Sequence, residues 1–206
     1  MRISILTPHL PGRERQLGEL HASIINQRRQ PDHWVVSHDF GNYGPTSNAN
    51  IALQASLISG CDYILPFSDD NVMYPQHLEV LESLAQGGAD ICYTPPVVIG
   101  RDGWQPNDDP DPERIKRESY IDASALVRRE LFIELQGWNP EAFPWPDWDF
   151  YKRAVDIGAV FARDSEQTWE YRFHGGNVSL GGLETRWTKE QGLSLAESPS
   201  PKNSAT

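Results

Sequence analysis

Residues 63–71 read Tyr63-Ile64-Leu65-Pro66-Phe67-Ser68-Asp69-Asp70-Asn71, an apolar run that leads directly into two adjacent carboxylates. The apolar part predicts a short buried β-strand over 63–65, because a continuous apolar run of this length suits a strand covered on both faces. Pro75 follows, and we expect it to open a helix that carries leucines at spacings of three. The segment is therefore predicted to be a strand, an acidic loop and a helix in succession.

The same alternation continues on both sides of this segment. Apolar runs predict strands at 3–6, 34–36 and 91–93, and periodic apolar positions predict helices over 13–28 and from 46 to 59. Alternating strands and helices are typical of a mostly parallel central sheet with helices on both faces. The sequence thus predicts a single α/β domain with a Rossmann-like sheet.

Polar clusters at 7–15, 39–42 and 68–71 follow the first three predicted strands. In a parallel sheet the ligand crevice lies beyond the carboxyl ends of the strands. We therefore expect these clusters to converge in space, although they are far apart in the sequence.

The second half of the chain is less regular. Residues 95–118 contain five prolines and are predicted to form a long surface loop, whose acidic residues are expected to be solvated. Further strands are expected at 123–127 and 169–173, with helices at 128–135 and 147–157. The Ser- and Pro-rich tail after Leu195 is expected to be disordered.

Composition narrows the classes of function. The 206 residues suit one domain, and none of their windows approaches the roughly 20 apolar residues of a membrane span or resembles a signal peptide, so we expect a cytoplasmic protein. The net charge of -11 argues against a long nucleic-acid partner. It does not argue against one small anionic ligand, because a divalent cation can offset the charge locally. Cys61 and Cys92 are interpreted as reduced core residues.

Asp69 and Asp70 are the first candidates for chemistry. Two carboxylates at the end of a buried strand are costly unless their charge is compensated, and Mg²⁺ or Mn²⁺ commonly compensates it. The alternative is a solvated loop in which Asp69 caps the next turn. The position at a strand end favours the metal.

Three further residues each have two interpretations. Asp147 either caps a helix or acts as a general base, flanked by Trp145 and Trp148, whose rings can stack on a sugar. His174, which precedes two glycines, is either structural or a metal ligand. Asp39 either hydrogen-bonds a nucleobase or caps a turn.

In order and spacing, these pieces together resemble the family 2 glycosyltransferases of the GT-A fold, over roughly residues 2–178. The resembling segments are 5–8, 23–27, 35–39, 50–53, 63–75, 125–132, 137–138, 146–149 and 171–179. Residues 68–71 occupy the DxD-like position of that family.

The resemblance implies a glycosyltransferase domain over 1–180, with a nucleotide-sugar-binding half at 1–94, an acceptor and catalytic half at 95–180, and an extension at 181–206. It implies a metal-dependent, inverting transfer from a nucleoside diphosphate sugar, in the pattern seen with uridine nucleotides, to an acceptor hydroxyl. Mn²⁺ or Mg²⁺ would stabilise the departing diphosphate. The acceptor is not identified by the resemblance.

Roles for individual residues follow from the same resemblance. The implied nucleotide-sugar contacts are Thr7, Pro8, Arg13, Asp39, Asn50, Ser68 and Asp69. Asp70 and His174 are the implied metal ligands, and Asp147 is the implied catalytic base. Trp145 and Trp148 are the candidates for contact with the acceptor sugar.

Three residues depart from the family pattern. Ser68 stands at the first Asp of the acidic run, Ala49 stands where many relatives have Arg, and Pro146 replaces the Glu before the base. Because Ala49 has no charge to offer a phosphate, we expect another cation to bind that group. The candidates are Arg13, Arg15 and Arg101.

Two other functions are weighed beside the transferase. A nucleotidyltransferase would form the sugar nucleotide, but segment 11–15 only faintly resembles the Gly-rich loop of that class. A non-catalytic saccharide-binding module would use the Trp-rich region 138–148 and would need no metal.

Overall fold

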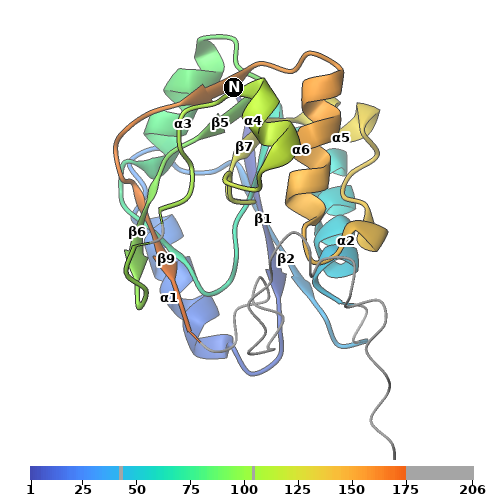
Figure 1. Cartoon of the computed structure of the whole chain (residues 1–206). Helices are drawn as coiled ribbons and strands as arrows, with labels where there is room; N and C mark the ends of the chain where they lie inside the picture. The colour runs from blue at the N-terminus through green and yellow to red at the C-terminus, as the bar shows by residue number, and fades with distance from the viewer. Residues whose placement is uncertain (42–43, 104, 175–206) are drawn as a thin grey trace, which may run out of the picture. The chain divides into compact units, whose positions relative to one another are not determined.

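The computed structural model describes residues 1–41, 44–103 and 105–174 (Figure 1). The chain forms two compact units, residues 1–173 and residues 174–206, and all of the described helices and strands lie in the first. The predicted extension at 181–206, its disordered end and the glycines after His174 lie outside the described residues. Within the described part, no helix has the length and apolar character needed to cross a bilayer.

A six-stranded sheet forms the centre of the first unit, in the order β2-β1-β3-β7-β5-β8. Its strands are β1 (Ile3–His9), β2 (His33–His38), β3 (Tyr63–Pro66), β5 (Ile91–Tyr93), β7 (Leu126–Arg128) and β8 (Phe161–Arg163). Only β7 runs antiparallel to its neighbours within this sheet. The predicted mostly parallel sheet is confirmed, and both predicted halves of the chain contribute strands to it.

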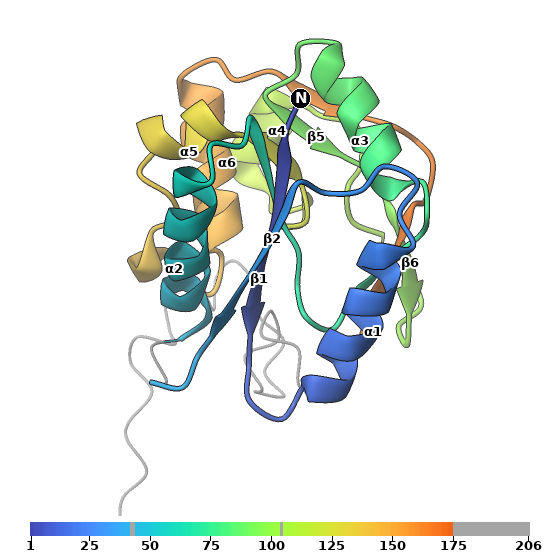
Figure 2. The ribbon, with the colours of Figure 1, turned by 180° about the vertical axis from the view of Figure 1, so that it is seen from behind.

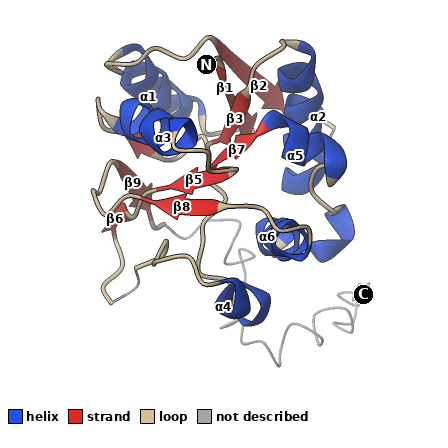
Figure 3. Ribbon diagram, turned by 90° about the horizontal axis from the view of Figure 1, so that it is seen from above, coloured by secondary structure: helices blue, strands red, loops and turns tan. Residues whose placement is uncertain are grey.

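Helices cover both faces of the sheet, as the end-on view shows (Figure 3). On one face lie α1 (Glu14–Ile25) and α3 (His77–Gln86), and on the other lie α2 (Pro45–Ile58), α5 (Arg129–Glu134) and α6 (Pro146–Asp156). A 3₁₀ turn spans Pro140–Ala142. The view from behind shows α1 and α2 on opposite sides of β1 and β2 (Figure 2).

Successive apolar side chains of the central strands contribute to separate hydrophobic cores on the two faces of the sheet. Ile5 belongs to the apolar cluster that includes Leu20 of α1 and Leu78 of α3, whereas Leu6 belongs to the cluster that includes Leu53 of α2 and Phe132 of α5. Successive strand residues point to opposite faces, so one run fills both cores. The two cysteines are free and buried, as predicted.

The prediction that residues 95–118 form a loop without regular structure is wrong in part. β6 (Pro96–Ile99) joins β4 (Val72–Met73) and β9 (Trp169–Arg172) in a second, three-stranded sheet of order β4-β9-β6, and α4 spans Pro112–Arg117. Two of the prolines that suggested a loop stand at the first residue of a strand and at the first turn of a helix. Both are positions where a missing N–H costs little.

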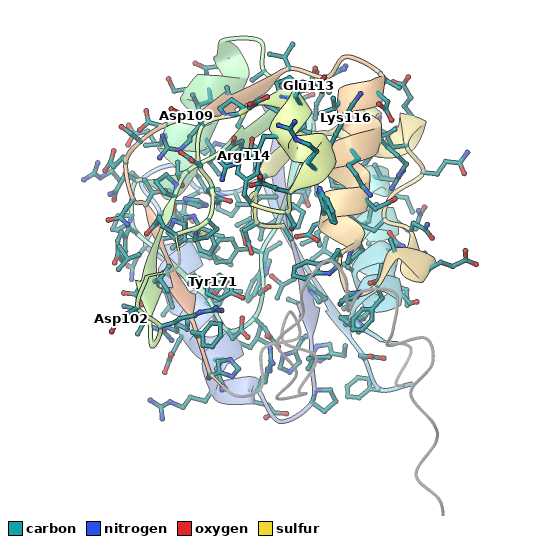
Figure 4. The ribbon with its side chains drawn as sticks, viewed as in Figure 1. Asp102, Asp109, Glu113, Arg114, Lys116 and Tyr171 are labelled. Carbon is teal, nitrogen blue, oxygen red and sulfur yellow. The ribbon has the colours of Figure 1, made fainter. Side chains whose placement is uncertain are left out.

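The acidic residues of this segment serve its local structure. Asp111 caps α4 by accepting hydrogen bonds from the backbone N–H groups of Glu113 and Arg114. Asp108 pairs with Arg114 and Asp109 with Arg163, both at 2.7 Å. Figure 4 shows Glu113 and Arg114 at α4, with Asp109 to their left. The three aspartates are exposed, as expected for solvated residues, and they also form these local contacts.

Gly137 is expected to be intolerant of any side chain. Its φ is +74°, and an added Cβ would lie 2.8 Å from Asn50 Oδ1 and 3.0 Å from Leu53 Cδ2. We expect Gly137→Ala to reduce the free energy of unfolding by about 2–4 kcal/mol, measured by urea denaturation, because backbone strain and a clash act together. Gly158→Ala is the matched control, with φ +79° and no atom within 4 Å of the added Cβ. It should cost only about 1 kcal/mol, and equal losses in the two variants would contradict the clash.

Candidate active site

The carboxyl ends of β1, β2 and β3 meet through direct hydrogen bonds. The backbone N–H of Asp39, after β2, donates to the carbonyl of His9 at 3.1 Å. His9 Nδ1 lies 2.9 Å from Asp69 Oδ2, and the backbone N–H of Leu10 donates to the same oxygen at 3.0 Å. The predicted convergence of the three polar clusters is therefore confirmed among the described residues.

Asp69 and Asp70 are both buried, with exposed fractions of 1% and 5%. The alternative of a solvated acidic loop is therefore wrong. Part of the compensating charge comes from Arg13, whose Nη1 lies 3.0 Å from Asp69 Oδ1 and 2.7 Å from Asp70 Oδ2. Arg13 precedes α1 and is itself mostly buried, so the β1–α1 segment supplies a cation to the pair.

Neighbouring contacts fix the loop that carries the acidic pair. The N–H of Phe67 donates to the carbonyl of Leu6 at 2.9 Å, which extends the pairing of β3 with β1. Asn71 is 2% exposed, and its Oδ1 accepts a hydrogen bond from the N–H of Arg172 at 3.1 Å. The loop is thus hydrogen-bonded to both sheets, and these contacts hold its carboxylates in place.

Asp147 lies in the first turn of α6, directly after Pro146. Burial raises the pKa of its carboxyl to about 7, and repulsion by Asp122 adds to the rise, whereas the backbone N–H groups of Trp148 and Asp147 oppose it. A carboxyl that titrates near neutral pH can accept a proton from a substrate hydroxyl. This supports the general-base interpretation over simple helix capping.

Asp122 is the residue that sequence reasoning missed on this side of the site. Burial raises the pKa of its carboxyl, the N–H of Ser124 lowers it, and the charge of Asp70 raises it further. The charge of Asp70 thus acts on Asp122, and the charge of Asp122 acts on Asp147. In the structure, the N–H of Ser124 donates to Asp122 Oδ1 at 2.8 Å just ahead of β7, which is a local contact typical of a turn. The sequence around Asp122 therefore shows nothing beyond an ordinary turn.

His9 was also missed as an individual residue. It lies inside the predicted polar cluster 7–15, yet no pattern there distinguishes an imidazole that contacts Asp69 from one that faces water. Its side chain is 4% exposed and its ring meets the ring of His38 edge-on, at a centroid distance of 5.0 Å. His9 therefore belongs to the polar centre around the acidic pair.

Several predicted nucleotide contacts have structural partners of their own. Thr7 is fully buried, and its hydroxyl accepts a hydrogen bond from Trp34 Nε1 at 3.0 Å. Both ends of the Asn50 amide bond the backbone of Trp138, at 2.8 and 3.1 Å. Asp39 accepts from the N–H of Gly44 at 3.1 Å, as expected for a turn cap. Contacts of these residues with a nucleotide stay predictions.

Pro8 and Ser68 are placed closer to the surface than the acidic pair. Pro8 pairs with Ser37 in the register of β1 and β2, and it is partly exposed. Ser68 is partly exposed and begins the turn in which the N–H of Asn71 donates to its carbonyl at 3.3 Å. Both lie at the ligand edge of the sheet, and their contacts with a donor stay predictions.

The tryptophans beside Asp147 differ in their surroundings. Trp148 Nε1 donates to the carbonyl of Ile115 in α4 at 2.6 Å, and Lys152 Nζ lies 4.5 Å from the centre of its ring. Trp148 therefore joins α6 to α4. Trp145 stands at the N-cap position of α6 and is partly exposed. A role for either ring in acceptor binding stays a prediction.

The described residues contain no group of three or more His, Cys, Asp or Glu side chains arranged to hold a metal ion. Mg²⁺ is commonly held by one or two carboxylates together with substrate phosphates, and buried carboxylates at a strand end suit that arrangement. Asp70 with Asp69 therefore fits a cation whose remaining ligands come from a diphosphate. His174 belongs to the second unit, and its role as a ligand stays a prediction.

No family model and no curated protein matches the sequence. The fold is similar to solved structures of S. aureus TarS, a glycosyltransferase with the GT-A fold. For TarS 1-349 in complex with UDP-GlcNAc the TM-score is 0.67 at 14% identity, covering 90% of this chain and 62% of that one. For the complex with UDP the TM-score is 0.66 at 15% identity, covering 85% and 61%.

A second solved protein, A197 from STIV, aligns with a TM-score of 0.54 at 15% identity, covering 80% of this chain and 82% of that one. This chain spans less than two thirds of the TarS chains that it matches. Likeness at these identities concerns the fold alone. The described unit thus has the GT-A fold, and this likeness by itself assigns no chemistry to its residues.

Proposed function

We propose that this chain, which has a GT-A fold, is a glycosyltransferase that moves a sugar from a nucleoside diphosphate sugar to an acceptor hydroxyl. The observation that carries the proposal is the buried Asp69–Asp70 pair at the carboxyl end of β3, in contact with Arg13 and His9. Such a pair suits a diphosphate with its metal ion, and Asp147, whose pKa is raised to about 7 by burial and by Asp122, can supply the base. Crystals of TarS with UDP and UDP-GlcNAc support a uridine donor.

Asp147 is the general base of the proposed reaction. The acceptor hydroxyl gives its proton to the Asp147 carboxylate as its oxygen bonds to C1 of the donor sugar. The bond between C1 and the diphosphate breaks on the opposite side, and the nucleoside diphosphate leaves with the electron pair, so the anomeric configuration inverts. A bound Mn²⁺ or Mg²⁺, held by Asp70, would supply positive charge at the leaving group.

Asp122 positions the base. Its charge raises the pKa of Asp147, and its own backbone is held by two neighbours. The N–H of Asp122 donates to Asn107 Oδ1 at 2.6 Å, and the Tyr151 hydroxyl of α6 donates to the carbonyl of Asp122 at 2.8 Å. These contacts connect the loop before β7 to the helix that carries Asp147. The acceptor and the expected cytoplasmic location stay open predictions.

The proposed function predicts release of a nucleoside diphosphate from at least one UDP-sugar. The protein is incubated with a panel of UDP- and GDP-sugars and Mn²⁺, and nucleoside diphosphate and pyrophosphate are measured separately. UDP release without pyrophosphate, abolished by EDTA, is the expected result. Pyrophosphate release would instead identify a nucleotidyltransferase. Thermal stabilisation by free sugars alone, with no release across the panel, would identify a saccharide-binding module.

A further inference from the structure

Arg13 contacts both carboxylates of the acidic pair. One nitrogen, Nη1, contacts both carboxylates, at 3.0 Å from Asp69 Oδ1 and 2.7 Å from Asp70 Oδ2. The exposed fractions of the three side chains are 14%, 2% and 7%. A guanidinium is always charged, so it compensates a buried carboxylate pair at any physiological pH.

Asp69 has further partners besides Arg13. His9 Nδ1 lies 2.9 Å from its second oxygen, and the N–H of Leu10 donates to the same oxygen at 3.0 Å. Removing Arg13 from Asp69 would therefore leave that carboxylate with two partners. Asp70 is contacted by Arg13 at 2.7 Å through Oδ2, so a divalent ion held by Asp70 would stand close to the guanidinium. Two positive charges so close together repel strongly at a buried site.

Arg13 is placed where it can change partners. It stands between the turn at Gly12, whose φ is +88°, and the first residue of α1. Its long side chain reaches the acidic pair from this end of the helix, and a planar guanidinium binds phosphate oxygens as well as it binds carboxylates. A diphosphate that arrives with a divalent ion thus offers Arg13 a new anion as the ion takes Asp70.

We propose that Arg13 is a resident cation of the donor site. It neutralises Asp69 and Asp70 while no donor is bound, and it transfers to the donor diphosphate when a divalent ion occupies Asp70. The inference rests on the proposed function for the identity of the anion, and it makes metal and nucleotide binding interdependent. The donor-free protein binds Mn²⁺ weakly because Arg13 competes with the ion for the Asp70 carboxylate.

The test measures Mn²⁺ binding to the protein without nucleotide, from the electron paramagnetic resonance signal of the free ion. Arg13→Gln removes the positive charge and keeps a polar side chain. We expect it to bind Mn²⁺ at least about tenfold more tightly than the unmodified protein. Arg13→Lys keeps the charge and should bind Mn²⁺ as weakly as the unmodified protein. In calorimetry with UDP and Mn²⁺, Arg13→Gln should bind UDP more weakly.

The matched control is Arg28→Gln, which makes the same charge change in the segment after α1. Arg28 is largely exposed and pairs with Glu79 at 3.7 Å, so its loss should leave Mn²⁺ affinity unchanged. Equal Mn²⁺ affinity in Arg13→Gln and Arg28→Gln would overturn the proposal. If Arg13→Gln does not fold, the proposal can still be tested on the unmodified protein. Equal Mn²⁺ affinity of that protein with and without saturating UDP would also overturn the proposal. Absence of UDP binding in every variant would refute the proposed function, whereas the nucleotide-free Mn²⁺ comparison would still stand.

Discussion

Asp147→Asn should lower turnover about a thousandfold while leaving the affinity for the donor unchanged. The amide has nearly the same shape as the carboxyl but cannot accept the acceptor proton, and general-base catalysis contributes roughly 10²–10⁴ in rate. Donor affinity is measured by calorimetry and turnover by diphosphate release with a competent acceptor. Unchanged turnover would rule out Asp147 as the base.

The pH dependence of turnover is a second test of Asp147 as the base. Burial and Asp122 raise the pKa of Asp147 to about 7, and a base acts only when its proton is absent. Turnover should therefore rise with pH through about 7 and level off above it. Asp149→Asn is the matched control, because Asp149 pairs with Arg153 at 2.9 Å on the same helix and lies two residues from the base. That variant should keep the turnover and the pH profile of the unmodified protein.

Asp70→Ala should remove the metal-dependent part of donor binding. We expect roughly hundredfold weaker binding of the UDP-sugar in Mn²⁺ and no such loss in EDTA, because changing even the outer-shell partners of metal ligands typically costs about 10–100-fold and Asp70 is proposed as a direct ligand. The fold should tolerate the change, since Arg13 retains its 3.0 Å contact with Asp69.

The control for Asp70→Ala is Asp102→Ala. Asp102 lies in the exposed turn beyond β6 and carries the same charge (Figure 4). Its removal changes the net charge equally without touching the acidic pair, so it separates a local metal contact from a general electrostatic effect. Metal-dependent binding that survives in Asp70→Ala would show that the ion binds elsewhere.

Local patterns determined the elements that build the site. The apolar run at 63–65 predicted β3, and the proline at 75 with its following leucines predicted α3, which begins at His77. The predicted helix at 147–157 matches α6, which spans Pro146–Asp156. Periodicity and turn chemistry act over a few residues, so a single sequence displays them directly.

Pairings between distant segments were beyond the reach of those patterns. No local sequence pattern predicts that β7 lies between β3 and β5. None predicts either that residues 96–99, expected to be part of a loop, form β6 and pair with β9. Strands as short as β6 and β7 are stabilised mainly by the neighbouring strands with which they pair. Whether such a segment forms a strand therefore depends on contacts with residues far away in the sequence.

The acidic pair likewise depends partly on local sequence and partly on tertiary contacts. The sequence by itself determined that Asp69 and Asp70 follow a buried strand and that their charge needs compensation. Only the tertiary structure decided which groups contact the pair, by bringing the cation of Arg13 and the ring of His9 from the end of β1 onto it. It likewise placed Asp122 so that its charge acts on Asp147. Charge compensation in a buried site depends on distance in space, and the chain sets that distance only when the sheet has formed.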